Sequence, residues 1–231
     1  MAELTKSLVL VVWNECAGCR VDLPRLPLAE FDEVFAIDGG STDGTVEYLT
    51  GQGIAVHRQS RRSLNAAYAD AVERSTCDAV VIFFPKATLD PAITLEIARR
   101  LDEGHAMVVA SRNLPGAHNE EDGKLFKPRK WGGGALSLFA ALVWKRRGPR
   151  VRDVLHGVKG FTVDAYRRMR ISPTGVTIDL EMVVRAYRLG LKVVEFPVHE
   201  APYEHGQTRF PLFRTGRRLG VFLLRELFRR D

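Results

Sequence analysis

Residues 37–45 read Ile-Asp-Gly-Gly-Ser-Thr-Asp-Gly-Thr, and this stretch decides the fold. It follows the apolar, strand-like run 34–37 and precedes the helix-like run 46–49. Glycine permits positive φ angles and close approach of a ligand to the backbone, and a polar side chain within 41–43 can cap the helix. Because ligands of open parallel sheets bind beyond the carboxyl ends of the strands, the stretch predicts a strand–turn–helix nucleotide site at Asp38.

Strand-like and helix-like segments alternate along the first half of the chain. We expect strands at 7–13, 33–37, 53–57, 78–84 and 106–110, and helices at 21–28, 43–51, 63–75 and 91–103. Such alternation predicts an α/β fold, in which a mostly parallel central sheet carries helices on both faces. In the second half we expect helices at 133–144, 175–190 and 211–230, a strand at 191–197, and a mobile loop at 111–130 over the site.

The composition is that of a soluble globular protein, with 45% hydrophobic and 27% charged residues among 231. We expect a cytoplasmic chain without a secretory leader or a transmembrane helix, because no run of about 18 apolar residues occurs. The net charge of +6 is concentrated in residues 129–170 and 205–231. A basic face of this kind suits phosphates or an anionic membrane surface; nucleic acid is disfavoured, because no RNA-recognition signature or aromatic-interleaved basic stretch is found.

A Cys-Ala-Gly-Cys segment at 16–19 follows the first expected strand, where thioredoxin-like proteins carry their redox motif. No second such pair follows, and four-ligand zinc spacing is absent. We therefore expect reduced thiols and no redox or zinc function.

The stretch 37–45 resembles the nucleotide-sugar-binding segment of family-two glycosyltransferases, which have the GT-A fold. Further matches to this family occur in the right order, and they resemble most the polyprenyl- and dolichyl-phosphate sugar transferases. They are Asn-Glu at 14–15, Ser-Arg at 111–112, Arg-Asp and Gly-x-Lys-Gly-Phe within 152–161, Asp-x-Glu at 179–181, Gly-Leu-Lys-Val-Val-Glu-Phe-Pro-Val at 190–198 and Gly-Gln-Thr-Arg at 206–209. The resemblance implies a GT-A-like domain over 1–210, and the residue pattern beyond it predicts a basic amphipathic helix over 211–231.

The resemblance also implies roles for individual residues. The nucleotide would be held by Glu15, Asp38, Gly39, Gly40 and Ser41. Arg112 and Lys159 would pair with phosphate oxygens, as cations do. Asp179 would act as general base if the acceptor is a hydroxyl, although it can equally be a helix N-cap.

One departure from the family concerns its metal site, an Asp-x-Asp at the end of the central strand. Residues 84–86 read Phe-Pro-Lys at that place. Mg²⁺ or Mn²⁺ requires oxygen ligands, so no cofactor is predicted; instead the Lys86 ammonium can supply positive charge to the leaving diphosphate. Two alternatives stay open: a nucleotide-sugar-binding pseudoenzyme without catalysis, and transfer with a metal held by Asp90 or Asp153.

We therefore expect inverting transfer of a sugar from a nucleotide-diphosphate sugar to a polyprenyl-phosphate or another acceptor. The helix at 211–230 places Leu219, Phe222, Leu223 and Leu227 on one side and arginines on another. It can either dock on the core or bind an anionic membrane surface. The second case predicts a peripheral location at the inner membrane face.

Overall fold

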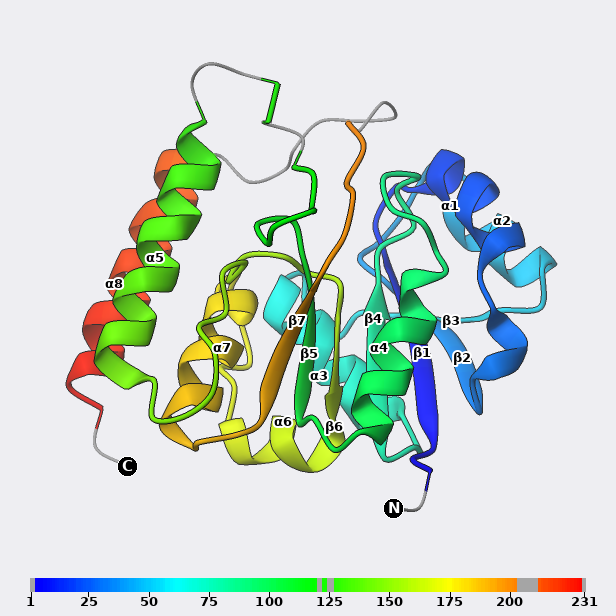
Figure 1. Cartoon of the computed structure of the whole chain (residues 1–231). Helices are drawn as coiled ribbons and strands as arrows, with labels where there is room; N and C mark the ends of the chain where they lie inside the picture. Colours follow the sequence, from blue (N-terminus) through cyan, green and yellow to red (C-terminus); the bar gives the residue numbers. More distant parts are fainter. Residues whose placement is uncertain (1–2, 120–121, 124–126, 203–211, 230–231) are drawn as a thin grey trace.

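The computed structural model describes residues 3–119, 122–123, 127–202 and 212–229 (Figure 1). Seven strands form one sheet in the order β3-β2-β1-β4-β6-β5-β7. The strands are β1 (Lys6–Val12), β2 (Glu33–Asp38), β3 (Ala55–Arg58), β4 (Ala79–Phe83), β5 (Met107–Ser111), β6 (Lys159–Thr162) and β7 (Val193–Pro197). Neighbouring strands are parallel except for β6, which is antiparallel to β4 and β5. The expected mostly parallel α/β sheet is confirmed.

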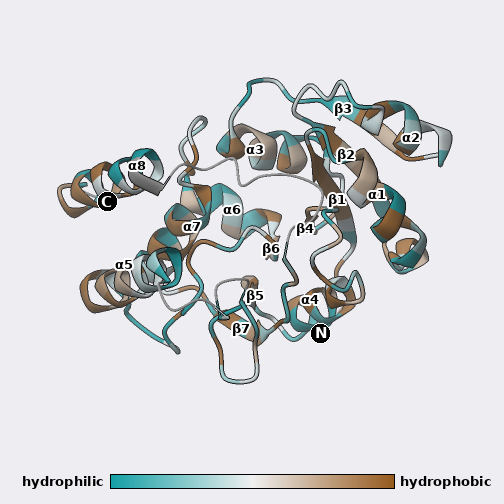
Figure 2. Cartoon of the chain, turned by 90° about the horizontal axis from the view of Figure 1, so that it is seen from above, coloured by the Kyte–Doolittle hydropathy of each residue, from teal (hydrophilic) through white to brown (hydrophobic). Residues whose placement is uncertain are grey.

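Helices cover both faces of the sheet (Figures 1 and 2). One face carries α1 (Cys16–Asp22), α2 (Thr45–Gly51) and α4 (Ile93–Asp102). The other carries α3 (Leu64–Arg74), α5 (Pro128–Trp144), α6 (Val163–Met169), α7 (Ile178–Arg188) and α8 (Leu212–Leu227). Alternate side chains of each strand enter opposite cores, as Leu8 and Val9 of β1 illustrate. A strand that is buried on both faces explains the continuous apolar runs in the sequence.

The expected strands lie within about two residues of those observed. Helix α5 begins at Pro128, inside the loop expected at 111–130, and three other features differ. The helix expected at 21–28 is wrong: α1 ends at Asp22, and two 3₁₀ turns follow at Leu23–Arg25 and Leu28–Glu30. Pro24 and Pro27 cannot donate the backbone hydrogen bonds that a continuous helix needs. Strand β6 and helix α6 were not expected. The segment 206–209 and parts of the loop expected over the site, at 120–121 and 124–126, lie outside the described residues.

Helix α8 packs against the body of the protein. Its residues Leu219, Phe222 and Leu223 are buried in the core that α7 shares. Glu226, which is 3% exposed, contacts the guanidinium of Arg185 in α7, with an Oε1–Nε distance of 3.5 Å. Docking on the core is therefore observed for one side of this helix, while a domain boundary at residue 210 stays a prediction. Among the described residues, no helix is long and apolar enough to cross a bilayer.

Candidate functional site

The glycine-rich turn begins at the carboxyl end of β2, where Asp38 is 4% exposed. The Asp38 carboxylate accepts hydrogen bonds from the backbone N–H of Gly40 at 2.9 Å, and from the N–H of Ser41 at 3.0 Å. It also accepts from the Ser41 hydroxyl at 2.5 Å. Gly40 has a φ of +94°, which a side chain would strain. Asp38 therefore shapes the turn, and any contact that it makes with a nucleotide is additional to this role.

The loop between β1 and α1 is joined to the same turn by side-chain hydrogen bonds. Asn14 donates its backbone N–H to Ser41 Oγ at 2.8 Å, and its Oδ1 accepts from the Thr42 N–H at 2.7 Å. The Glu15 N–H donates to Thr45 Oγ1 at 2.9 Å. The structure thus brings Glu15 and Asp38 to the ends of adjacent parallel strands, beside one turn.

An aromatic wall stands next to the turn. A Cβ placed on Gly39 would lie 3.1 Å from the Cβ of Trp13, so only glycine fits there without a shift. The guanidinium of Arg62 lies 3.8 Å from the centre of the Trp13 ring, a cation–π contact. Sequence reasoning did not include Arg62, because nothing in its spacing connects it to the first strand.

The Phe-Pro-Lys segment follows β4 and is held by α1. A Cβ on Gly18 would lie 2.2 Å from the carbonyl oxygen of Pro85, which shows how closely α1 approaches this segment. The buried Asp22 carboxylate accepts a hydrogen bond from the Ala87 N–H at 2.8 Å. Burial raises the pKa of Asp22 above its ordinary value. Lys86 is therefore anchored through its backbone at the carboxyl edge of the sheet, with its Nζ 5.5 Å from the centre of the Phe84 ring.

A second group of side chains surrounds Asp179, at the start of α7. Its Oδ1 lies 2.7 Å from the Nζ of Lys159, which is fully buried in β6. The Tyr68 hydroxyl donates to the Gly157 carbonyl at 2.6 Å and lies 3.4 Å from the same Asp179 oxygen. Burial raises the pKa of Tyr68 well above its ordinary value. A Cβ on Gly157 would lie 2.6 Å from the Phe84 ring, so this group touches the Phe-Pro-Lys segment.

Arg112 lies at the end of β5 in an ion-pair cluster. Its guanidinium makes two hydrogen bonds to the Asp153 carboxylate, at 2.8 and 3.0 Å, and one to Glu200 at 3.0 Å. Although burial alone would raise the pKa of Asp153, Arg112 holds it well below its ordinary value. His156 in the same cluster has a pKa lowered by burial, and its Nδ1 lies 2.5 Å from the Ala110 carbonyl. Arg112 and Lys159 thus both have carboxylate partners, which the sequence prediction of phosphate binding did not include.

The segment that the resemblance places at the metal site, Phe-Pro-Lys at 84–86, carries no oxygen ligand in its side chains. Neither Phe84 nor Lys86 offers an oxygen ligand, which Mg²⁺ and Mn²⁺ prefer. Within the described ranges, no group of three or more His, Cys, Asp or Glu side chains is arranged to hold a metal ion. Asp90 and Asp153, the alternative holders, are engaged in ion pairs with Arg25 and Arg112.

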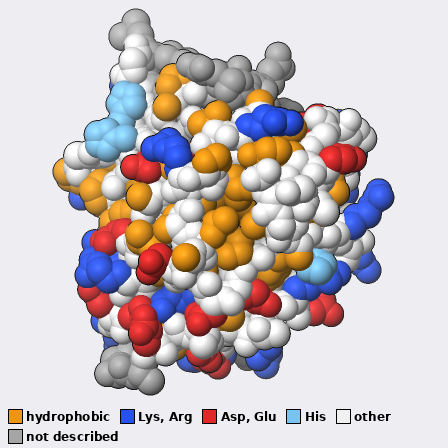
Figure 3. All heavy atoms as spheres, turned by 90° about the vertical axis from the view of Figure 1, so that its right-hand side faces the viewer, with side chains coloured by type: hydrophobic (Ala, Val, Ile, Leu, Met, Phe, Trp, Pro, Cys, Tyr) orange, Lys and Arg blue, Asp and Glu red, His pale blue; other side chains and the backbone are white. Residues whose placement is uncertain are grey.

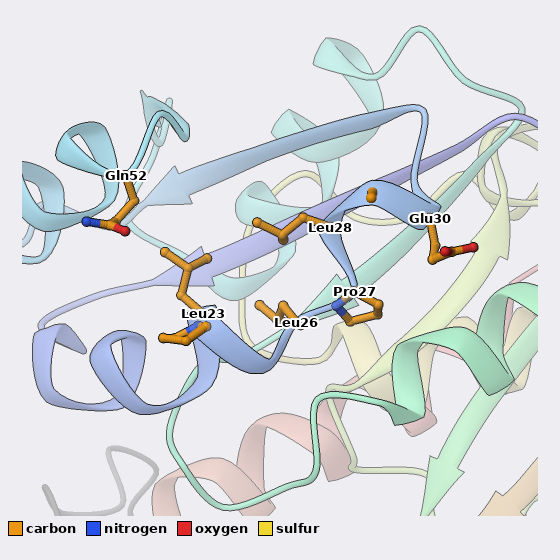
Figure 4. Close-up of a pocket in the computed structure, with 8 residues that line it drawn as sticks. Leu23, Leu26, Pro27, Leu28, Glu30 and Gln52 are labelled. Carbon is orange, nitrogen blue, oxygen red and sulfur yellow. The ribbon is translucent and has the colours of Figure 1, made fainter.

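One hollow on the surface lies away from these groups. It has a volume of about 480 Å³ and is lined mainly by residues 23–30 and Gln52 (Figure 4). Apolar side chains gather on this flank of the molecule, with acidic and basic side chains below them (Figure 3). This hollow contains none of the predicted site residues, which gather instead at the strand ends.

The chain is similar in sequence to three glycosyltransferases, although no protein-family model matches it. It is 28% identical to glycosyltransferase AglJ of Haloferax volcanii, over 87% of this chain and 63% of that protein. It is 27% identical to glycosyltransferase AglD of the same organism, over 97% of this chain and 37% of that protein. The undecaprenyl-phosphate mannosyltransferase of Micrococcus luteus is 24% identical, over 87% and 85%. The chain thus spans less than two thirds of the two Haloferax relatives.

Solved structures of glucosyl-3-phosphoglycerate synthase from Mycobacterium tuberculosis have a similar fold. The complex with phosphoglyceric acid has a TM-score of 0.73 at 20% identity, over 99% of this chain and 81% of that one. A second structure, with Mn²⁺, UDP and phosphoglyceric acid, has the same TM-score at 19% identity. The chain therefore has the GT-A fold and resembles glycosyltransferases in sequence over most of its length.

Proposed function

We propose that this chain transfers a sugar, with inversion, from a nucleotide-diphosphate sugar to a polyprenyl-phosphate or another acceptor. The observation that carries the proposal is the joining of the β1–α1 loop to the glycine turn after β2, at the carboxyl edge of parallel strands. The names of the curated relatives support it, and one of them is an undecaprenyl-phosphate mannosyltransferase. Neighbours of the same fold have been solved with UDP and UDP-glucose.

The nucleoside end of the donor is assigned to the first two strand ends. Glu15 and Asp38 supply carboxylate oxygens for ribose or base, and Gly39, Gly40 and Ser41 let a ligand approach the backbone. The turn is held by Asp38 and Asn14 before any ligand arrives. Such preorganisation reduces the entropy that binding would otherwise cost.

The diphosphate end is assigned to Lys86. Neighbours of the same fold have been solved with Mn²⁺ or Mg²⁺ and UDP, whereas Phe84 and Lys86, which the resemblance places at the metal motif, offer no oxygen ligand. A leaving diphosphate needs positive charge whatever supplies it, and an ammonium at this strand end provides it without a metal. The presence of Phe84 and Lys86 in place of carboxylates also supports a second candidate function, a nucleotide-sugar-binding pseudoenzyme that binds a donor but transfers nothing.

The acceptor attacks the anomeric carbon opposite the departing diphosphate. A phosphate acceptor is already anionic and needs little proton removal, whereas a hydroxyl needs a base. Asp179 is the proposed base, and its pairing with Lys159 balances its charge inside the protein. Because Arg112 is bonded to two carboxylates, its proposed contact with phosphate would require it to share its guanidinium or to leave Glu200.

A lipid-linked acceptor would place the chain at a membrane surface. We therefore propose a peripheral location at the cytoplasmic side of the inner membrane, where donors and lipid phosphates meet. The basic charge of residues 129–170 and 205–231 favours such a surface.

Calorimetry with UDP, GDP and their sugars, with and without EDTA, tests the donor assignment. We expect binding of at least one nucleotide, unchanged by EDTA, and about tenfold weaker binding by Lys86→Ala because a charge-assisted hydrogen bond contributes roughly 1.5–3 kcal/mol. Asp38→Ala should bind several-fold more weakly. Loss of native binding in EDTA, or unchanged affinity in Lys86→Ala, would reject the metal-independent form. Binding without transfer to polyprenyl-phosphate or other acceptors would favour the pseudoenzyme.

A further inference from the structure

We propose that α5 and α8 together form a docking face for an anionic lipid bilayer. The first observation is where large apolar side chains remain exposed. Twelve are exposed in the described residues, and nine of them belong to these two helices or to the residue after α8. The nine are Trp131, Leu138, Phe139, Leu142, Val143, Val221, Leu224, Leu227 and Phe228.

These side chains lie on the outward side of each helix, because the other side is packed against the body of the protein. In α5 four of the five buried positions are small, including Gly133, Ser137 and Ala140, which lets most of the helix lie close to the body of the protein, and the fifth is Trp144. In α8 the buried positions are Leu219, Phe222, Leu223 and Glu226. The outward residues reach 77% exposure at Leu142 and 84% at Phe228, so they cannot be explained as core.

The two helices lie on the same flank of the molecule. Figure 2 shows both beyond α7, and Figure 1 shows that they run in the same direction and begin at the same end. Helix α5 packs against α7, and α8 is joined to α7 through Arg185 and Glu226. Their outward residues are therefore held by one support and can meet a single surface.

The charges around these residues select the partner. Residues 127–152 contain no Asp or Glu, and exposed cations follow α5 at Lys145, Arg146, Arg147 and Arg150. On α8 the exposed cations are Arg214, Arg217, Arg218 and Arg225, and the one carboxylate, Glu226, is buried against Arg185. In the described parts of α5 and α8, an apolar strip is accompanied by cations and by no exposed carboxylate, which fits an anionic bilayer. A second copy of the chain would meet it with like charges, which disfavours self-association.

The position of α5 connects this face to the candidate site. The helix follows the carboxyl end of β5, and β5 points in the same direction as β1 and β4 because both β4 and β5 are antiparallel to β6. Both helices begin toward this carboxyl edge, which also carries Asp38 and Lys86, although they lie on the flank of the sheet opposite β2 and β3 (Figure 1). The docking itself does not depend on the proposed sugar transfer.

Flotation with vesicles of phosphatidylcholine, with and without phosphatidylglycerol, tests this face. We expect the native chain to bind when phosphatidylglycerol is present, and the triple variant Leu142→Ser/Leu224→Ser/Phe228→Ser to bind at least tenfold more weakly because less apolar area enters the bilayer. Arg217→Gln/Arg218→Gln should lose about 30-fold on anionic vesicles. The matched controls are Leu95→Ser on α4, which is 39% exposed, and Arg167→Gln/Arg168→Gln on α6; both should bind as the native chain does.

A second measurement does not depend on the folding of the triple variant. Trp131 is 56% exposed on α5, and its fluorescence, taken as the difference between the native chain and Trp131→Phe, should be quenched by brominated lipid. Native binding that is absent, or equal for the triple variant, would overturn the proposal. So would a native dimer that the triple variant converts to a monomer, because the face would then be a protein interface. Vesicles contain no donor, so this outcome is separate from success or failure of sugar transfer.

Discussion

Substitution of Gly18 by alanine should disturb the Phe-Pro-Lys segment, because α1 approaches this segment more closely than a methyl group allows. The added Cβ would lie 2.2 Å from the Pro85 carbonyl oxygen and 2.8 Å from the Lys86 Cα. Both are backbone atoms, so no side-chain rotation relieves the overlap. Restoring an ordinary contact of about 3.5 Å requires α1 and the segment to separate by about 1 Å.

The expected cost has two parts. Overpacking of this kind destabilises by about 1–3 kcal/mol, while alanine in place of glycine within a helix stabilises by roughly 0.5–1 kcal/mol. The net loss of unfolding free energy should therefore be about 1 kcal/mol, within a range of about 0–2.5 kcal/mol. If Lys86 contacts the donor diphosphate, a displacement of its backbone by about 1 Å should also weaken nucleotide binding about tenfold, since a charge-assisted hydrogen bond contributes roughly 1.5–3 kcal/mol.

Gly51→Ala is the matched control. Gly51 is also helical, in α2, and a Cβ there would meet nothing within 4 Å. This variant should be as stable as the native chain or slightly more stable, with unchanged nucleotide affinity. Urea unfolding and calorimetry measure the two quantities. Equal stability of Gly18→Ala and Gly51→Ala would refute the close approach; a loss of stability with unchanged affinity would show that Lys86 does not serve the donor.

Two further predictions concern other groups. Asp179→Asn should lower the rate of transfer to a hydroxyl acceptor about 100-fold or more while leaving donor affinity unchanged. It should also destabilise the fold by about 3 kcal/mol, because the ammonium of Lys159 stays buried without a carboxylate. Steady-state kinetics and urea unfolding measure the two effects, and an unaffected rate would exclude Asp179 as the base. Cys19 should resist iodoacetamide at pH 8 in the folded protein, because burial raises the pKa of its thiol to about 12, whereas Cys16 is partly accessible. Mass spectrometry locates the label, and rapid labelling of Cys19 would support a redox function for this pair of cysteines.

The layers of the fold followed from local patterns in the sequence. Apolar runs such as 79–83 predicted β4 because a central strand of a parallel sheet is buried on both faces. Strand β6 escaped this reasoning because it contains a lysine and a glycine. Lys159 is buried there with its charge balanced by Asp179, and Gly160 leaves room for Ile97 of α4, whose Cγ2 would lie 2.3 Å from a Cβ. Neither the pairing of Lys159 with Asp179 nor the packing of Ile97 on Gly160 can be recognised before α7 and α4 are placed against the sheet.

The candidate site divides in the same way. Glu15 and Asp38 were expected together because the Asn-Glu and Asp-Gly-Gly segments resemble nucleotide-binding motifs of one family, and the structure places them at neighbouring strand ends. Tyr68 was not expected, because its contact with Asp179 joins residues 111 positions apart. Spacing along the chain also could not show that the Cys-Ala-Gly-Cys segment contains a glycine required by the approach of α1 to Pro85. The close approach of α1 to Pro85 thus explains the glycine of this segment, Gly18, without any redox chemistry.

The ion pairs of the buried cations reduce the number of side chains that can offer positive charge to a diphosphate. Arg112 makes three side-chain hydrogen bonds to Asp153 and Glu200, and Lys159 is fully buried against Asp179. A phosphate that approached either cation would have to displace a carboxylate, and breaking a buried ion pair costs several kcal/mol. Lys86 is only partly buried, and its backbone is anchored at the strand end by the contacts of α1. Hence substitution of Arg112 or Lys159 should act mainly on stability, whereas substitution of Lys86 should act mainly on nucleotide affinity, and the relative sizes of these effects separate a structural cation from one that serves the donor.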